Sequence, residues 1–144
     1  MMRIFTIGYE GATQAELVAA LKTAGVEQVI DVRAVPNSRR PGFSKHILAA
    51  GLAEAGIDYV HLKALGTPAD GRAAARAGQH ALLERIYAAQ LETPEAGLEA
   101  ARMIALAQEK ASALLCYERD PAECHRTLLR LSAMPEWEAI DLLP

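Results

Sequence analysis

Cysteine and long apolar runs are scarce in this chain. Its 144 residues hold two cysteines, too few for the disulfide framework of a small secreted scaffold, although a single bridge is possible. No stretch approaches the roughly 20 consecutive apolar residues of a membrane-spanning helix. We therefore expect no membrane role.

A secretory signal, internal repeats and low-complexity linkers are also absent from the sequence. The first residues, Met1, Met2 and Arg3, lead at once into a strand-like run without an apolar signal segment or a cleavage site. A cytoplasmic location is the resulting expectation. Apolar residues make up 51% of the chain, which together with its length predicts a single domain over residues 1–144.

Acidic residues are missing from one segment of an acidic protein. Residues 32–53 contain no Asp or Glu but hold four basic side chains and His46; removing those four charges from the net charge of −3 leaves −7 on the rest. The acidic remainder argues against generic binding of polyanions. The basic segment instead indicates a specific anion site.

Apolar runs alternate with helix signals along the chain. We expect strands at 4–7, 28–32, 57–62, 112–117 and 137–143, the last at an edge, and helices at 13–25, 44–55, 79–91, 94–110 and 121–133. Residues 65–78 are undecided between an ordered loop and a mobile lid. This order predicts a three-layer α/β domain: a mostly parallel sheet of about five strands with helices on both faces.

The carboxyl ends of parallel strands meet at one rim of the sheet, where ligands bind in open α/β folds. The segment 116–126 directly follows a predicted strand and concentrates two thiols, three carboxylates, an imidazole and two guanidinium groups. Asp120, Pro121 and Glu123 supply the signals of a helix start. The chemistry of this protein is therefore predicted at that rim.

Several rim motifs together resemble the domain-of-unknown-function 488 family. The resemblance spans Ile4 to about Leu131, and each motif is present in full. The motifs are Thr6-Ile7-Gly8-Tyr9, Asp31-Val32-Arg33, Pro36-Asn37-Ser38-Arg39, Gly42-Phe43-Ser44-Lys45, Tyr59, Leu65-Gly66 and Cys116 to Arg126. The resemblance implies a compact α/β domain with a polar pocket. It implies no established reaction, so function is argued from the residues.

Proton transfer has three candidate residues. Asp31 lies one residue before the end of a predicted strand, and Glu118 follows Cys116 by two, so each could face the rim. His125, in the first turn of the predicted helix, could exchange a proton near neutral pH. Asp31 and Glu118 could equally serve as structural partners of rim arginines.

Candidate ligand-binding residues fall into three groups. Ser38, Arg39 and Lys45 belong to the basic segment, beside a helix start whose free N–H groups suit an anion. Arg33 and Arg126 could hold the same anion or pair with rim carboxylates. The glycine of Gly8-Tyr9 would let backbone approach a phosphate or base, on which Tyr9 could stack, although Tyr9 could simply cover the core.

Cys116 and Cys124 are possible reactive thiols. Cys116 holds a rhodanese-like position, at a strand end before a loop and a helix, but the carboxylates of Glu118 and Asp120 in that loop disfavour a thiolate. A helix N-terminus would lower the pKa of the Cys124 thiol, but the spacing of Cys124, Leu128 and Leu131 suggests that it faces the core. No metal is expected, because the spacing of Cys116, Cys124, His125 and His61 matches no standard zinc pattern.

Three functions fit these residues. The first, which the density of titratable groups at one rim favours, is a hydrolase or transferase acting on a phosphorylated or nucleotide-like small molecule, with arginines holding the anion and Asp, Glu or His moving protons. The second is a nucleotide or nucleic-acid binding module without turnover. The third is a thiol or sulfur-transfer protein. The sequence indicates neither a cofactor nor an oligomeric state.

Overall fold

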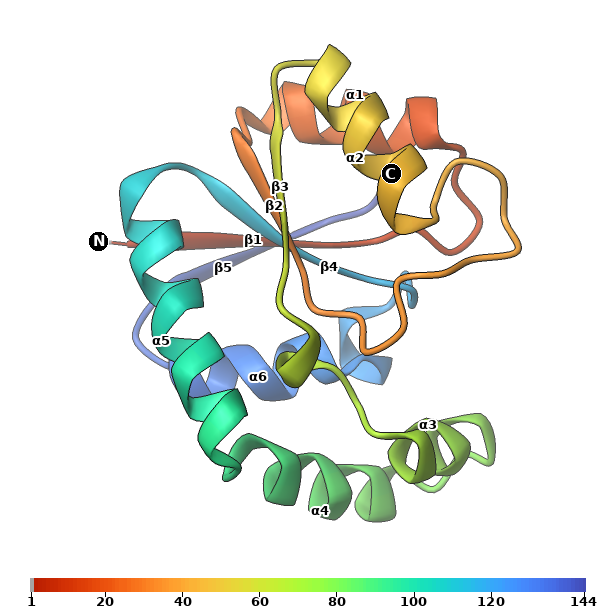
Figure 1. Cartoon of the computed structure of the whole chain (residues 1–144), viewed down its shortest axis with the longest axis vertical. Helices are drawn as coiled ribbons and strands as arrows, with labels where there is room; N and C mark the ends of the chain where they lie inside the picture. Colours follow the sequence, from red (N-terminus) through yellow and green to blue (C-terminus); the bar gives the residue numbers. More distant parts are fainter. Residues whose placement is uncertain (1) are drawn as a thin grey trace.

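The computed structural model describes residues 2–144, in which five parallel strands form one sheet in the order β3-β2-β4-β1-β5 (Figure 1). The strands are β1 (Arg3–Gly8), β2 (Gln28–Asp31), β3 (Asp58–His61), β4 (Ser112–Cys116) and β5 (Glu138–Leu142). The helices are α1 (Gln14–Ala24), α2 (Lys45–Glu54), α3 (Ala69–Arg76), α4 (His80–Leu91), α5 (Pro94–Glu109) and α6 (His125–Ala133), with short 3₁₀ turns η1 (Lys63–Leu65) and η2 (Pro121–Glu123).

Helices cover both faces of the sheet, which confirms the predicted three-layer fold. Figure 1 shows α1 and α2 on one side and α4, α5 and α6 on the other. Alternation along β4 divides its side chains accordingly: Leu115 joins the apolar cluster under α1 and α2, whereas Leu114 and Cys116 join the cluster under α4, α5 and α6. The sheet is entirely parallel, and β5 is its edge beside β1.

The predicted capping residues are in place at two helices. Thr13 and Glu16 form a reciprocal capping box at the start of α1, and Gly25 ends that helix with a φ of 78°. Thr93 caps α5, with Pro94 at its first position. Ser44 precedes α2 but makes no side-chain cap; its hydroxyl group bonds the backbone of Ser38 instead.

The helix predicted over 121–133 is wrong in its first turn. Residues Pro121–Glu123 form a 3₁₀ turn, Cys124 is extended with φ −118° and ψ 144°, and α6 begins only at His125. Asp120 does act as a cap, accepting a bond from the N–H group of Ala122 at 2.9 Å. Leu131 is 53% exposed, so the inferred apolar spacing from Cys124 does not hold there.

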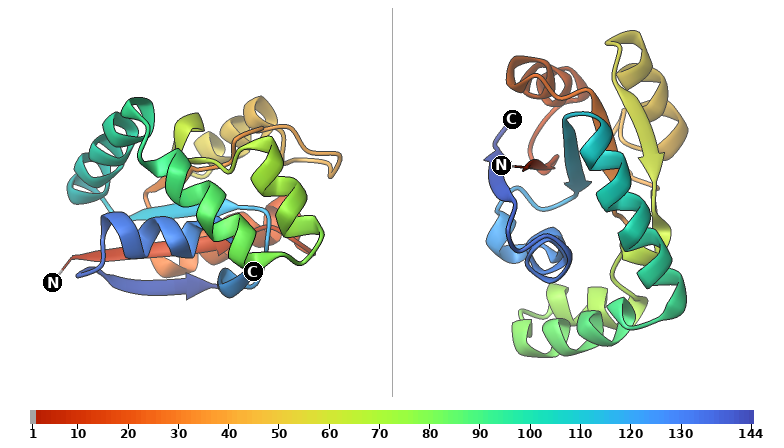
Figure 2. Two further views of the ribbon diagram at one scale, coloured as in Figure 1. Left: turned by 90° about the horizontal axis from the view of Figure 1, so that it is seen from below. Right: turned by 90° about the vertical axis from the view of Figure 1, so that its left-hand side faces the viewer.

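Residues 69–76 of the undecided segment form helix α3, which packs beside α4 as a helical hairpin (Figure 2). The hairpin lies on the α6 side of the sheet. No helix within residues 2–144 is long and apolar enough to cross a membrane.

Strand β4 lies at the point where the order in which strands are added to the sheet reverses. The connections from its neighbours β1 and β2 pass over the α1–α2 face, whereas the chain leaving β4 forms α6 on the opposite face. Ligand crevices in open parallel sheets form beyond the strand ends at such switch points. The residues that follow β4 are therefore the first place to look for a site.

Candidate functional site

A cavity of about 530 Å³ opens at this rim of the sheet. Cys116, Glu118 and His125 line it from β4 and the segment that follows. The α3–α4 hairpin supplies another wall through Arg72 and Arg76, among others. The volume lies in the range of sites for small molecules.

Asp31 and Arg33 form a buried ion pair beside the cavity. The Arg33 Nη2 atom lies 2.7 Å from Asp31 Oδ2, and its Nε donates to Oδ1 at 2.9 Å. The Tyr59 hydroxyl group also donates to Asp31, and Arg33 Nη1 donates to the Phe43 carbonyl at 2.7 Å. Burial opposes the charge of Arg33, but its bonds to Asp31 raise the pKa of the guanidinium overall. The pair fixes the loop that joins β2 to α2.

This ion pair and the cysteines belong to opposite faces of the sheet. Asp31 follows the alternation of Val29, toward α1 and α2, whereas Cys116 lies on the face covered by α4, α5 and α6. Asp31 does not line the cavity, although Arg33 does. The structure therefore brings Glu118 and His125 toward the cavity and leaves Asp31 committed to Arg33 and Tyr59.

Within the predicted basic segment, Ser38, Arg39 and Lys45 lie outside the cavity, whereas Arg33 lines it. Ser38 and Ser44 bond to one another through backbone and hydroxyl groups. Arg39 is exposed, and neither Arg39 nor Lys45 lines the cavity. An anion site at these residues remains a prediction.

Two arginines of α3 that line the cavity were not predicted as site residues from the sequence. Arg72 and Arg76 are spaced by one helical turn, so they share a face of α3. Arg72 is half-buried and donates to the Thr67 carbonyl at 2.8 Å, whereas Arg76 is exposed. Their four-residue spacing was the available signal, but it becomes informative only once residues 69–76 are known to be helical.

Gly8 allows the end of β1 to lie close against the segment that follows β4. A Cβ atom on Gly8 would lie 1.7 Å from the Glu118 carbonyl oxygen, so the space that a ligand phosphate could have used holds protein backbone. Tyr9 lines the cavity, stacks on Phe43 with ring centroids 4.5 Å apart and meets Tyr117 edge-on at 5.3 Å. Tyr9 thus covers the core and presents an aromatic wall to the cavity.

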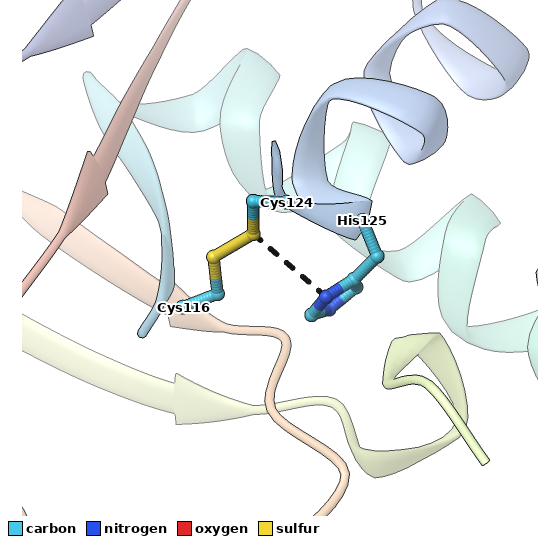
Figure 3. Close-up of side chains that lie close together, drawn as sticks. All are labelled: Cys116, Cys124 and His125. Carbon is cyan, nitrogen blue, oxygen red and sulfur yellow. Dashed lines mark hydrogen bonds between the residues drawn. A yellow bond between two sulfur atoms is a disulfide. The ribbon is translucent and has the colours of Figure 1, made fainter. Parts of the chain in front are cut away.

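Cys116 and Cys124 are joined by a disulfide bond (Figure 3). The bridge, possible but unsupported from the sequence, links the end of β4 to the residue that precedes α6. Both side chains are buried, at 1% and 4% exposed, and of the two only Cys116 lines the cavity. The extended backbone at Cys124 carries its sulfur back toward β4.

Arg126 is the most unusual group at the site. It has no exposed surface, yet it makes no ion pair within 4 Å among residues 2–144. Its Nη1 donates to Cys116 Sγ at 2.9 Å and to the Glu118 carbonyl oxygen at 2.6 Å, while Nε has no partner. Burial lowers the pKa of this guanidinium, opposed by the charges of Asp141 and Glu118. A buried cation therefore lies directly against the sulfur of Cys116.

Glu118 is the carboxyl group nearest to that sulfur. Its Oε2 lies 3.5 Å from Cys116 Sγ. The side chain is half-buried, and burial raises its pKa. The environment therefore favours the protonated carboxyl form more than water does.

His125 is held as a neutral imidazole. Its Nε2 lies 2.7 Å from the Val32 carbonyl oxygen, which can only accept, so Nε2 carries the proton. The bare Nδ1 faces Cys124 Sγ at 3.8 Å (Figure 3), and the ring meets Tyr87 edge-on. Burial lowers the pKa of His125 to about 4. At neutral pH this group donates a hydrogen bond through Nε2 and carries no charge.

This burial predicts a specific pH dependence of stability. The unfolded chain protonates His125 near pH 6.5, whereas the folded chain does so only near 4, so unfolding takes up a proton between those values. The contribution of neutral His125 to the free energy of unfolding is fully present above pH 6.5, and up to about 3 kcal/mol of it is lost as pH drops to 4. Urea unfolding measured over that range in wild type and His125→Gln tests this. An equal loss in both proteins would show that His125 does not contribute.

The donor atoms of Cys116, Cys124 and His125 lie within 4.8 Å of one another, so these residues could hold a metal. In the disulfide form the sulfurs are bonded to each other, and a metal would require their reduction. The Arg126 cation against Cys116 disfavours a second cation there. The expectation that no metal binds stays a prediction, which elemental analysis of the reduced protein tests.

Comparison with family models agrees with the rim motifs from Asp31 to Arg126 and does not extend to the motif at Thr6–Tyr9. None of the curated proteins or solved structures compared with this chain matches it. A family model described as "Domain of unknown function DUF488" matches residues 13–132, which include the ion pair, the basic segment, the α3–α4 hairpin and both cysteines. The chain therefore belongs to the family of domain of unknown function DUF488.

Proposed function

We propose that this protein is a thiol–disulfide enzyme that acts on a small molecule in the rim cavity. One observation carries the proposal: the buried Arg126 guanidinium, without a carboxylate partner, donates a hydrogen bond to the Cys116 sulfur that lines the cavity. An unpaired buried cation is costly. A thiolate on Cys116, formed when the bridge is reduced, would supply the missing negative charge.

The surrounding groups suit disulfide exchange. The Cys116 thiolate attacks one sulfur of a substrate disulfide, whose S–S bond breaks as the first thiol leaves with a proton from Glu118. Cys124 sulfur then attacks Cys116 sulfur, releasing the second substrate thiolate and closing the protein bridge. The proton lost by Cys124 restores Glu118 through solvent. The substrate gains two electrons, the cysteine pair loses two, and an external dithiol reduces the pair again.

The proposal also fits the expected cytoplasmic location. Disulfides are uncommon in reducing compartments, and those that occur there are usually catalytic or redox-sensing. Proton transfer by Asp31 has less support, because Asp31 already accepts bonds from Arg33 and Tyr59.

A phosphorylated or nucleotide-like ligand is the second candidate. The observation that favours it is the joint presence of Arg72, Arg76 and the Tyr9 ring at one cavity. A thermal-shift panel of phosphate, nucleotides and sugar phosphates tests it, since a ligand at 100 times its dissociation constant adds about 2.7 kcal/mol. A shift that disappears in Arg76→Gln would support this candidate, and one lost only in Arg39→Ala would favour the predicted nucleotide or nucleic-acid module.

The test of thiol–disulfide function follows one round of oxidation. Reduced protein, freed of reductant, is mixed with bis(2-hydroxyethyl) disulfide, and protein thiols are counted by mass spectrometry. Wild type should consume one disulfide, form the Cys116–Cys124 bridge and release two small thiols. Cys116→Ser should remain unreacted on that timescale. Equal rates for wild type and Cys116→Ser would contradict the proposal.

A further inference from the structure

We infer that the substrate is an anionic small-molecule disulfide, whose negative groups are bound by Arg72 and Arg76 of α3. This inference rests on the proposed function. It assigns a ligand role to a helix whose arginines are needed for none of the chemical steps.

The substrate must be small because Cys116 is buried in the wall of the cavity. Its side chain is 1% exposed, so a disulfide on a protein surface could not approach it without rearrangement. The cavity of about 530 Å³, in contrast, can enclose a small ligand with its sulfur atoms against Cys116.

The two α3 arginines bring uncompensated charge to the cavity. Ion pairs among residues 2–144 are Asp31–Arg33 and Asp58–Lys110, so the charge of Arg33 is neutralised and those of Arg72 and Arg76 are not. Guanidinium groups match carboxylates with two parallel hydrogen bonds. Because the two residues lie one turn apart on one helix face, a ligand with one or two carboxylates can engage both.

The segment after β4 brings acidic groups to the same cavity. Glu118 and Glu123 line it, and Glu118 Oε2 lies 3.5 Å from Cys116 Sγ. Glu123, and Glu118 once it has given up its proton, disfavour negative charge on this side of the cavity and direct the anionic part of a ligand toward α3. The cavity therefore favours ligands whose negative groups lie away from their disulfide bond.

The experiment compares three small symmetric disulfides: dithiodipropionate, which is anionic, bis(2-hydroxyethyl) disulfide, which is neutral, and cystamine, which is cationic. Oxidation rates of the reduced protein are divided by each compound's rate with free 2-mercaptoethanol, which removes intrinsic reactivity. We expect the order anionic, neutral, cationic, and a weaker preference in 0.5 M salt. In Arg72→Gln/Arg76→Gln the anionic-to-cationic ratio should fall by about tenfold.

Two controls keep the result interpretable. Arg85→Gln/Arg102→Gln removes two exposed arginines that do not line the cavity and should retain the wild-type preference. Arg76→Gln alone changes an exposed side chain, so it should fold and still reduce the ratio. An unchanged ratio in both α3 variants would overturn this inference alone. Failure of all three disulfides to react faster with wild type than with Cys116→Ser would remove the proposed function, and this inference with it.

Discussion

Replacing Asp31 with asparagine is expected to lower the free energy of unfolding by about 3–5 kcal/mol. Asp31 has no exposed surface and accepts bonds from the Arg33 side chain, the Arg33 N–H group and the Tyr59 hydroxyl group. The substitution leaves the Arg33 guanidinium buried without its counter-charge. Urea unfolding measures the loss, which should occur with an unchanged m value.

Asp58→Asn is the matched control for that experiment. It removes the other ion pair of residues 2–144, between Asp58 and Lys110, whose side chains are 61% and 38% exposed. Solvent screens such a pair, so its removal should change stability little. A loss at Asp31 no larger than at Asp58 would contradict the structural role of the Asp31–Arg33 pair.

Replacing Arg126 with methionine is expected to slow the reaction of reduced Cys116 with a neutral disulfide by about 10- to 100-fold at pH 7. Without the guanidinium, the pKa of the Cys116 thiol rises and less thiolate is present. Methionine fills the buried space without a charge. The informative measurement is the pH profile, because its midpoint should move to higher pH while the plateau rate is retained.

Arg130→Met controls for the loss of a neighbouring arginine. Arg130 lies one turn further along α6 and also has a buried Nε without a partner, but no hydrogen bond joins it to either sulfur among residues 2–144. Its pH profile should match that of wild type. Identical profiles for the two variants would show that the Arg126 cation does not control the Cys116 thiol.

Most helices and strands were predictable because their sequence signals are local. The capping box at Thr13 and the Thr93-Pro94 start each specify a helix from a few adjacent residues. Apolar runs such as 112–116 predict strands in the same way. Signals for 3₁₀ and α turns overlap, which is why the helix start at Pro121 was predicted without the break at Cys124.

The composition of the site was predicted better than its arrangement. The pairing of Asp31 with Arg33, and the approach of Glu118 to Cys116, follow from alternation along a strand end. The contact between Arg126 and Cys116 depends on the path of the intervening loop, which no periodicity encodes. Nearby carboxylates argued against thiol chemistry in the sequence, whereas the fold places a guanidinium nearest to the sulfur.

Trapping the intermediate tests the central claim most directly. Reduced Cys124→Ser, mixed with bis(2-hydroxyethyl) disulfide, lacks the thiol that would close the bridge, so a mixed disulfide should accumulate. We predict one 2-mercaptoethanol adduct per chain, mapped by peptide mass spectrometry to Cys116, and none on reduced Cys116→Ser in the same time. An adduct on Cys124 in Cys116→Ser at an equal rate, or no adduct on either variant, would contradict Cys116 as the attacking thiol.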